Sequence, residues 1–420
     1  DQEAAPTHSG SADLDLDSYK IADTVVVTID DQDLNTDSEL IDVYITDATT
    51  DKVGLGTSSH VIDITFDDAL WTGLAETGFT LVETGNDSGI FVGSFQVPEN
   101  ANSSPATGTD IEVNYNDFRD GSGNTIEVGD GASIRANTGS VSFDRTVYPV
   151  PFAASEYQMH ATASAVTYLD AGPVQVHIQI ADADYDVSAA GQDSVSTSVL
   201  DVKVQRGSSS TANLMPGTAV DILETTPDSG IFEYDLEIAS AITFTDGTTP
   251  AKVLQGDIIT VTYTDPQDAS GKSQTVTDSS SFDLRNGVLQ SDKSVYLIGS
   301  DMILTLIEPD FDLDNDETES YTLDLIEWDS DAAETTMGAL GISWTVGATT
   351  YTSEAAFDPE PSTFRETGDS TGIFQVVIEI PDTLAGNLLD RGEKIDLEYT
   401  DEGPAGADYV GQEDEDIGLT

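Results

Sequence analysis

The chain has 420 residues, no cysteine, and a formal net charge of −65 that comes from 14 Lys and Arg against 79 Asp and Glu. Such a charge repels nucleic acid and anionic lipid, so we expect neither as a partner. The absence of cysteine excludes disulfides, thiolate catalysis and cysteine-bound zinc. No run of about 18 apolar residues exists that would insert this segment into a membrane.

The acid excess has two interpretations, and they are compatible with each other. One is adaptation to salt and to solubility, and the other is a specific role for bound cations. In both, self-repulsion destabilises the compact chain unless counter-ions or bound metals screen it.

Internal repetition is the strongest pattern in the sequence. A turn block in which Glu stands eight residues before Phe occurs three times, as Glu83–Phe91, Glu224–Phe232 and Glu366–Phe374. The three Phe positions are separated by 141 and 142 residues (232 − 91 and 374 − 232). Repetition at a fixed period indicates an array of one structural unit.

Two further blocks recur in the same order. One reads acid, any residue, Asp, large apolar residue, Asp or Asn, and the other ends in Tyr-x-Asp. Unit starts also match, because Asp144–Tyr148 parallels Asp292–Tyr296. We therefore predict three domains at residues 1–144, 145–291 and 292–420, with an insert near 149–166 in the second and the third cut before its last strand.

Each unit is expected to consist of strands. In chain order, a Val-rich strand precedes the first acidic block, and further strands follow at 140–143, from 173, after each Ile-Phe pair and at 279–284. Apolar and acidic residues alternate from Phe232 to Ile238, which places one row in a core and the other in water. No amphipathic helix of three turns is visible. We predict an all-β chain of tandem immunoglobulin-like antiparallel β-sandwich domains that form an extended array.

The acid-x-Asp-apolar-acid block is the best candidate for a cation site. It follows a core strand directly, and its alternate carboxylates offer the hard oxygen ligands that Ca²⁺ prefers. The alternative is a solvated acidic loop that caps turns. The calcium hypothesis takes ligands from all three copies of this block and from the Tyr-x-Asp strand ends: Asp31, Asp33, Asn35, Asp117, Asp182, Asp184, Asp186, Asp265, Glu308, Asp310, Asp312, Asp314 and Asp401.

The Glu-containing turn is expected first as a fold marker. Its Gly residues, at 89, 230 and 372, are predicted to take a backbone angle that other residues avoid, and its Phe residues to anchor the core. The alternative makes Glu83, Glu224 and Glu366 cation ligands. Two glycosylation sequons start at Asn86 and Asn102, and Asn86 lies in a predicted turn.

Catalysis finds little support in the sequence. The four His residues fall at unmatched positions of the repeat, and His177 is expected on the polar face of its strand. Threefold repetition argues against a single active site, so we do not expect an enzyme. A secreted carbohydrate-active enzyme would require catalytic segments outside this chain.

The repeated turns, the acidic loops, the Tyr-Thr-Asp strand ends and the acid excess resemble the surface-layer proteins of ammonia-oxidising archaea. The resemblance covers all three units and implies a glycosylated, extracellular, structural protein that assembles with copies of itself into a two-dimensional lattice. It further implies acidic pores that favour cations, including ammonium. The alternative from another class is an adhesin or stalk whose domains space a distal binding module.

Overall fold

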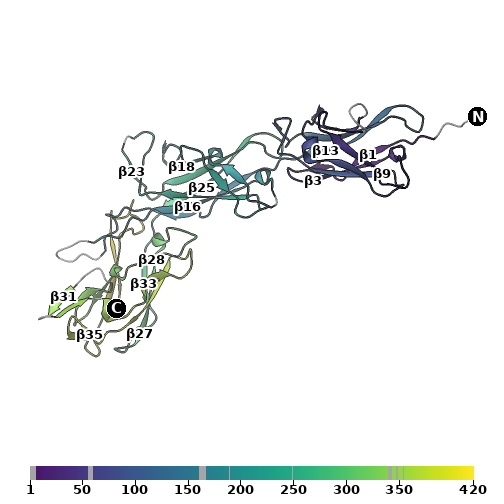
Figure 1. The fold of residues 1–420 in the computed structure, drawn as a ribbon. Helices are drawn as coiled ribbons and strands as arrows, with labels where there is room; N and C mark the ends of the chain where they lie inside the picture. Colours follow the sequence, from purple (N-terminus) through teal and green to yellow (C-terminus); the bar gives the residue numbers. More distant parts are fainter. Residues whose placement is uncertain are drawn as a thin grey trace, which may run out of the picture.

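The computed structural model describes residues 6–54, 60–159, 167–188, 190–247, 249–338, 343–346, 349–352 and 354–420. Figure 1 shows three bodies in a row, with the third turned away from the line of the first two. In the described part of the chain the only α-helix is a single turn, Glu354–Phe357. No helix there has the length and apolarity needed to cross a bilayer.

Unit 1 is a two-layered β-structure in which β4 belongs to both layers, because it pairs with β8 at one end and with β5 at the other. Its sheet order is β1-β3-β9-β8-β4-β5-β6-β12-β13-β2. The strands are β1 (Ser11–Leu14), β2 (Ser18–Tyr19), β3 (Thr24–Asp30), β4 (Val43–Asp47), β5 (Lys52–Gly54), β6 (His60–Phe66), β7 (Ala69–Leu70), β8 (Thr80–Glu83), β9 (Ile90–Gln96), β10 (Asn100–Ala101), β11 (Ser104–Pro105), β12 (Asp110–Asp117) and β13 (Ile126–Ile134).

Unit 2 repeats this plan with two separate sheets, β14-β16-β21 and β15-β25-β24-β18-β19. Its strands are β14 (Ser140–Phe143), β15 (Val147–Pro149), β16 (Val174–Ala181), β17 (Ser194–Ser196), β18 (Leu200–Arg206), β19 (Ser209–Ser210), β20 (Asp221–Leu223), β21 (Ile231–Ile238), β22 (Ala241–Ile242), β23 (Ala251–Lys252), β24 (Ile258–Asp265) and β25 (Gln274–Asp283).

Unit 3 has the sheets β26-β27-β34-β33-β28 and β30-β29-β37-β38. Its strands are β26 (Val288–Ser291), β27 (Asp301–Ile307), β28 (Ser320–Tyr321), β29 (Ile326–Asp329), β30 (Glu334–Thr336), β31 (Ser343–Val346), β32 (Thr349–Thr352), β33 (Glu360–Glu366), β34 (Ile373–Glu379), β35 (Thr383–Leu384), β36 (Asn387–Leu388), β37 (Asp396–Asp401) and β38 (Glu415–Leu419).

The all-β prediction and the tandem organisation are confirmed, and the immunoglobulin-like assignment stays a prediction. Phe232, Leu236 and Ile238 are buried, and Asp235 and Glu237 between them are exposed, as the alternation predicts. Two short pairings, β13 with β2 and β15 with β25, are parallel rather than antiparallel. They arise because the chain crosses to the second sheet soon after each unit begins.

β14 and β26 are the first strands of the second and third units. β14 pairs with β16 and β26 with β27, just as β1 pairs with β3. The sheets of these two units thus begin before the predicted boundaries near residues 145 and 292. Sequence comparison missed this because the matching Asp-x-x-x-Tyr segments lie one strand further along the chain.

The insert of the second unit joins units 2 and 3. The ring of Tyr157 contacts Phe152 and Phe311, and its hydroxyl hydrogen-bonds that of Tyr399. Gln175 N–H also donates to the Leu313 carbonyl at 2.9 Å. Buried apolar residues therefore form one continuous core through units 2 and 3, whereas unit 1 has a core of its own.

These cores predict two unfolding transitions in calorimetry, one for unit 1 and one for units 2 and 3 together. Tyr157→Ala should lower only the shared transition, because removing a buried aromatic side chain costs about 3–5 kcal/mol. Trp71→Ala, which empties a buried site in unit 1, is the matched control and should lower only the other transition. Loss of both transitions in either variant would contradict the division.

Candidate functional site

The first acid of each acidic block holds the tyrosine of the Tyr-x-Asp strand end. The Tyr115 hydroxyl donates to Asp31 Oδ2, Tyr263 to Asp182 Oδ2 at 2.5 Å, and Tyr399 to Glu308 Oε2 at 2.8 Å. The other oxygen of each acid accepts a backbone N–H two residues on and caps a short 3₁₀ turn. These acids therefore have hydrogen-bond donors on both oxygens.

The aspartate of each Tyr-x-Asp strand end fixes the segment that enters the unit. Asp117, Asp265 and Asp401 accept the N–H groups of Gly10, Gly139 and Gly287 at 2.9–3.1 Å. Each also accepts an N–H two residues further along its own chain. We call the first acid, the tyrosine and this aspartate the linker clasp.

Glycine is required where each linker passes the clasp. A Cβ at Gly10 would lie 2.4 Å from the Tyr115 ring, and one at Gly139 would lie 2.6 Å from the Tyr263 ring. A Cβ at Gly287 would lie 2.5 Å from Glu308 Oε2. The clasp therefore selects a glycine at the entrance of every unit through lack of space.

The clasp is buried, and burial dominates its electrostatics. Burial raises the pKa of Asp31 and of Asp182, although the tyrosine hydroxyls and backbone N–H groups oppose this. Burial and the hydrogen bond to Asp31 raise the pKa of Tyr115 far above its ordinary value. Glu308 behaves in the same way, and its pKa is raised by burial and by nearby Asp310 and Asp401.

The middle acid of each block holds a second point of the same linker. Asp184 accepts the N–H and side-chain Nδ2 of Asn137 at 2.7–2.9 Å, and burial raises the pKa of Asp184 to about 6 despite these bonds. Asp33 accepts from His8 and Asp310 from the N–H of Arg285. All three donors stand two residues before the clasp glycine.

The residue at the third acid position of each block does not contact the linker. It lies in a separate group of side chains that we call the acidic corner. In unit 2 the corner is Asp186, Asp193 and Glu224, and in unit 3 it is Asp312, Glu319 and Glu366. In both, oxygens from the three carboxylates lie within 4.8 Å of one another. The same positions of unit 1 carry Asn35, Asp42 and Glu83, where Asp42 N–H donates to Glu83 Oε2.

The turn glutamate of each corner holds the turn closed, as the fold-marker prediction states. Glu83 Oε1 accepts the N–H groups of Ser88 and Gly89 at 3.0 and 3.1 Å. Gly89, Gly230 and Gly372 have φ of 64°, 61° and 58°, which confirms the predicted backbone angle. Burial by itself favours the protonated form of Glu224, but three backbone N–H groups lower its pKa.

The three corners balance their charge in three different ways. In unit 1 the Asn35 amide donates to Asp87 at 2.8 Å, so that one acid is replaced by a donor. In unit 3 the Arg145 guanidinium donates to Asp312 Oδ1 at 2.7 Å, and Glu319 and Glu366 share a hydrogen bond. Burial and this neighbour raise the pKa of Glu319 to about 8.

The corner of unit 2 has neither an amide in place of one acid nor a guanidinium beside its carboxylates. Within the described part of the chain, no Lys, Arg or His forms an ion pair with Asp186, Asp193 or Glu224. Burial raises the pKa of Asp186, and Glu224, Asp228 and Asp193 add to the effect. Backbone N–H groups donate to Asp193 and Glu224, but no basic side chain of a described residue offsets their charge. Carboxylates at this spacing suit a hard cation such as Ca²⁺.

One polar atom of the corners has spare acceptor capacity. Asn35 Oδ1 is buried and forms no hydrogen bond to another described residue, whereas Glu319 is already hydrogen-bonded to Glu366. A buried acceptor without a donor is costly, and a bound cation would satisfy it. The corners of units 2 and 3 fit a cation better than the clasps, because oxygens of three carboxylates converge within 4.8 Å there.

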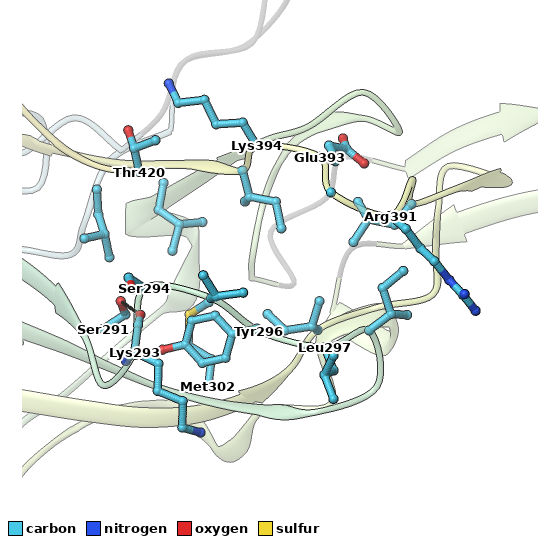
Figure 2. A pocket seen from close by; sticks show the side chains of 18 of the residues that line it. Ser291, Lys293, Ser294, Tyr296, Leu297, Met302, Arg391, Glu393, Lys394 and Thr420 are labelled. Carbon is cyan, nitrogen blue, oxygen red and sulfur yellow. Dashed lines mark hydrogen bonds between the residues drawn. The ribbon is translucent and has the colours of Figure 1, made fainter.

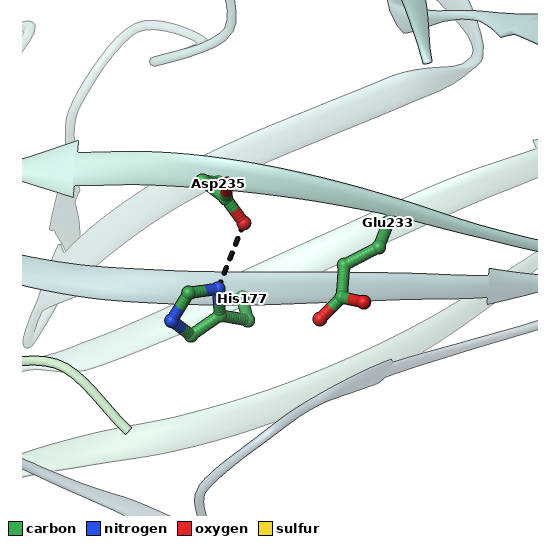
Figure 3. A group of neighbouring side chains, drawn as sticks. All are labelled: His177, Glu233 and Asp235. Atoms are coloured by element: carbon green, nitrogen blue, oxygen red, sulfur yellow. Dashed lines mark hydrogen bonds and ion pairs between the residues drawn. The ribbon is translucent and has the colours of Figure 1, made fainter. Parts of the chain in front are cut away.

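His177 lies among acids on the polar face of its strand, as expected, but this position is buried. It is buried at 6% exposure, with Nδ1 at 2.7 Å from Asp235 Oδ1 (Figure 3). Its Nε2 lies 2.9 Å from Asp314 Oδ1. Because Asp314 belongs to unit 3, the imidazole spans the joint between units. Sequence alternation missed this because the covering residue comes from the next unit.

His177 carries a proton at neutral pH. Burial alone lowers its pKa, but hydrogen bonds to Asp314 and Asp235, with Asp144 and Asp316 nearby, raise it to about 9. Glu233 also lies close to the ring, and together with His177 and Asp235 it forms a third group with metal-ligand spacing. Since both ring nitrogens face carboxylates, a protonated clamp explains this group better than a metal.

The structure thus divides the thirteen predicted calcium ligands. Nine lie at the clasps and their linker contacts, three (Asn35, Asp186 and Asp312) lie in the corners, and Asp314 binds His177. Sequence analysis missed Asp42, Asp193 and Glu319 as corner members. Their common distance of seven residues after Asn35, Asp186 and Asp312 was the available signal.

Both sequon asparagines are exposed. Among the described residues, the Asn86 side chain forms one hydrogen bond, from its Nδ2 to the Glu39 carbonyl at 3.1 Å. Asn102 is tied at both ends of its amide, to Thr72 and to the Leu70 carbonyl. Asn86 is therefore the more accessible of the two for modification.

No protein-family model and no curated protein matches this chain. Among solved structures, the *Escherichia coli* adhesin FdeC matches with 11% identity and a TM-score of 0.19, over 100% of both chains. The FN1–FN3 domains of chicken CNTN1 match with 9% identity and a TM-score of 0.18, over 99% of both chains. Dimeric latent PorU from *Porphyromonas gingivalis* matches with 10% identity and a TM-score of 0.18, over 99% of this chain and 34% of that one.

The turn glutamate should matter for stability. Glu83→Ala removes the acceptor of three backbone N–H groups, each of which costs about 1–3 kcal/mol if it is left buried and unpaired. The unit 1 transition should therefore fall clearly in calorimetry. Glu76→Ala, at an exposed glutamate of the same unit, should leave it unchanged, and equal effects would refute the role of the turn.

The His177 clamp predicts a pH dependence. Its folded pKa of about 9 lies above the ordinary 6.5, so its stabilisation is complete below about pH 6.5 and is lost as pH rises through 9. The melting temperature of units 2 and 3 should fall across this range. In His177→Gln this fall should disappear, and an unchanged pH profile would contradict the clamp.

Proposed function

We propose that this chain is a section of an extracellular, non-catalytic structural protein that assembles into an acidic layer on the cell surface. The observation that carries the proposal is the acidic corner, whose positions recur in all three units and hold three carboxylates in units 2 and 3 of a chain with net charge −65. Repeated units with a shared acidic site suit an array in which each unit has the same structural task.

The proposed cation is Ca²⁺, and its strongest site is the corner of unit 2. Asp186, Asp193 and Glu224 supply three carboxylates, with Asp228 beside them. Unit 1 replaces one carboxylate by the Asn35 amide, and unit 3 already receives Arg145. We therefore infer that cation affinity decreases from unit 2 to the other two units.

Cations also resolve the problem of assembly. Two molecules of this charge repel each other, because salt at 0.1 M screens the repulsion beyond about 10 Å but not at contact distance. Divalent ions that bridge carboxylates offset this repulsion at contacts. Openings in such a layer are lined by acids and concentrate cations, ammonium among them, over anions. Asn86 is the proposed glycosylation site on its exposed surface.

A stalk or adhesin is the second candidate, and one structural feature favours it. Units 2 and 3 share a core and are held as one body by Tyr157, Arg145 and His177. A row of joined sandwiches spaces a distal module well. The two candidates differ in whether the protein forms sheets with copies of itself.

One preparation tests the cation and the assembly. Purified protein in dilute buffer should gain melting temperature with Ca²⁺ and form ordered sheets in negative-stain microscopy, and EDTA should dissolve them. Asp193→Asn should remove most of the calcium-dependent gain, while Glu319→Gln should keep it. Isolated rods with calcium would favour the stalk, and a melting temperature unaffected by calcium would refute the cation site.

A further inference from the structure

Unit 3 has an open groove at a place that units 1 and 2 fill. The groove has a volume of about 810 Å³, and its apolar lining includes Val295, Tyr296, Leu297, Met302, Ile395 and Leu419. Figure 2 shows its two walls, with Ser294, Tyr296 and Leu297 on one and Arg391, Glu393 and Lys394 on the other, and Thr420 at one end. Val295 and Leu297 are 79% and 77% exposed, which is unusual for apolar residues of this size.

The equivalent walls in the other units are covered. Tyr19 and Tyr148 are 1% and 0% exposed, whereas Tyr296 is only partly buried. All three tyrosines donate to the aspartate four residues before them, so their positions correspond. Likewise Ile111 and Ile259 are fully buried, and Ile395, which also stands four residues before a clasp tyrosine, is not.

The cover in units 1 and 2 is the second half of the last strand. In unit 2 this part of β25 pairs parallel with β15 through Phe282 and Tyr148, and antiparallel with β24 through Ser281 and Ile258. Phe282 and Leu284 are buried, as are Ile134 and Ala136 at the same places of unit 1. This one strand therefore pairs with two neighbouring strands and places two apolar side chains in the core.

The backbone of unit 3 is already shaped for such a strand. Gly108 and Gly256, with φ of 78° and 81°, donate their N–H groups to the carbonyls of Ile134 and Phe282 at 2.8 Å. Gly392 stands at the same position with φ of 84°. Among the described residues, no backbone acceptor binds the Gly392 N–H.

The register fixes how the strand lies. Leu419 pairs with Leu397 as Asp278 pairs with Val261, so Thr420 occupies the place of Ser279. Phe282 and Leu284 stand three and five residues after Ser279. The apolar residues of the occupant therefore belong at the third and fifth positions after Thr420, with the third beside Tyr296.

Charge limits the occupant further. Three of the 14 basic residues of the chain line this groove, namely Lys293, Arg391 and Lys394, alongside two acids, Asp390 and Glu393. Lys293 and Lys394 form ion pairs with Asp292 and Asp396, so Arg391 is the basic side chain of the groove for which no ion pair to a described residue is found. It favours an acidic residue between the two apolar ones, as Asp283 lies between Phe282 and Leu284.

We propose that the groove binds an acidic, apolar-alternating β-strand that continues β38 directly past Thr420, parallel to residues 295–297 and antiparallel to residues 392–395. The strand closes unit 3 by the pairing that closes units 1 and 2. Gly392 donates to its third carbonyl, and its third and fifth side chains cover Tyr296 and Ile395.

The test extends the chain after Thr420 with the unit 2 sequence of residues 280–285, Ser-Ser-Phe-Asp-Leu-Arg. The control extension, Ser-Ser-Ser-Asp-Ser-Arg, has the same charge and length without the apolar side chains. The first extension should raise the melting temperature of units 2 and 3 by several degrees and slow hydrogen exchange of the Gly392 amide by about tenfold or more. Equal behaviour of the two extensions would overturn the proposal.

Two further experiments test whether the strand binds in this groove and whether it must belong to the same chain. Leu297→Ser should cancel the gain in the extended chain but leave the original chain unchanged, because Leu297 is exposed there. The free hexapeptide Ser-Ser-Phe-Asp-Leu-Arg, added to the original chain at millimolar concentration, should give little stabilisation. If it stabilises as much as the fused strand, the groove accepts strands from a second molecule, and continuity with β38 is refuted.

Discussion

Burial of many carboxylates in a chain with few basic residues is the constraint on which this structure depends. A buried carboxylate is costly unless hydrogen bonds or charges compensate it. The chain has only 14 Lys and Arg that could supply such charges to its 79 acids. Asp117, Asp265 and Asp401 are instead compensated by backbone N–H groups of the incoming linker. The excess of acid is thereby used to fix where each unit begins.

The same constraint explains why the acidic corners differ from the clasps. A clasp closes with donors from its own backbone and from a tyrosine, so its composition changes little between units, with Glu308 in place of an aspartate in unit 3. A corner gathers three side chains of one charge, and each unit relieves this in its own way, with an amide at Asn35, with Arg145 from the neighbouring unit, or with no partner at Asp186. The variable element is therefore the place where external cations have the most to contribute.

Sequence patterns predicted the strands and the repeat because these follow from local alternation and spacing. They also identified the residues of the clasp, since acids and tyrosines recur at fixed positions. The sequence patterns did not show that these acids form two separate sites. Asp184 and Asp186 are close in the block, but across the 3₁₀ turn Asp184 contacts the linker and Asp186 lies in the corner. The burial of His177 was equally hidden, since its partner Asp314 lies 137 residues away in another unit.

The joints between units are unlike each other, and this has a mechanical consequence. Units 2 and 3 share a core, and side chains from both sides interlock through the insert around Tyr157. Between units 1 and 2 the cores are separate, and Gly108 lies against Gly271 with no side chain between them. Because no shared core resists bending there, we expect the joint between units 1 and 2 to yield before the joint between units 2 and 3 under lateral load.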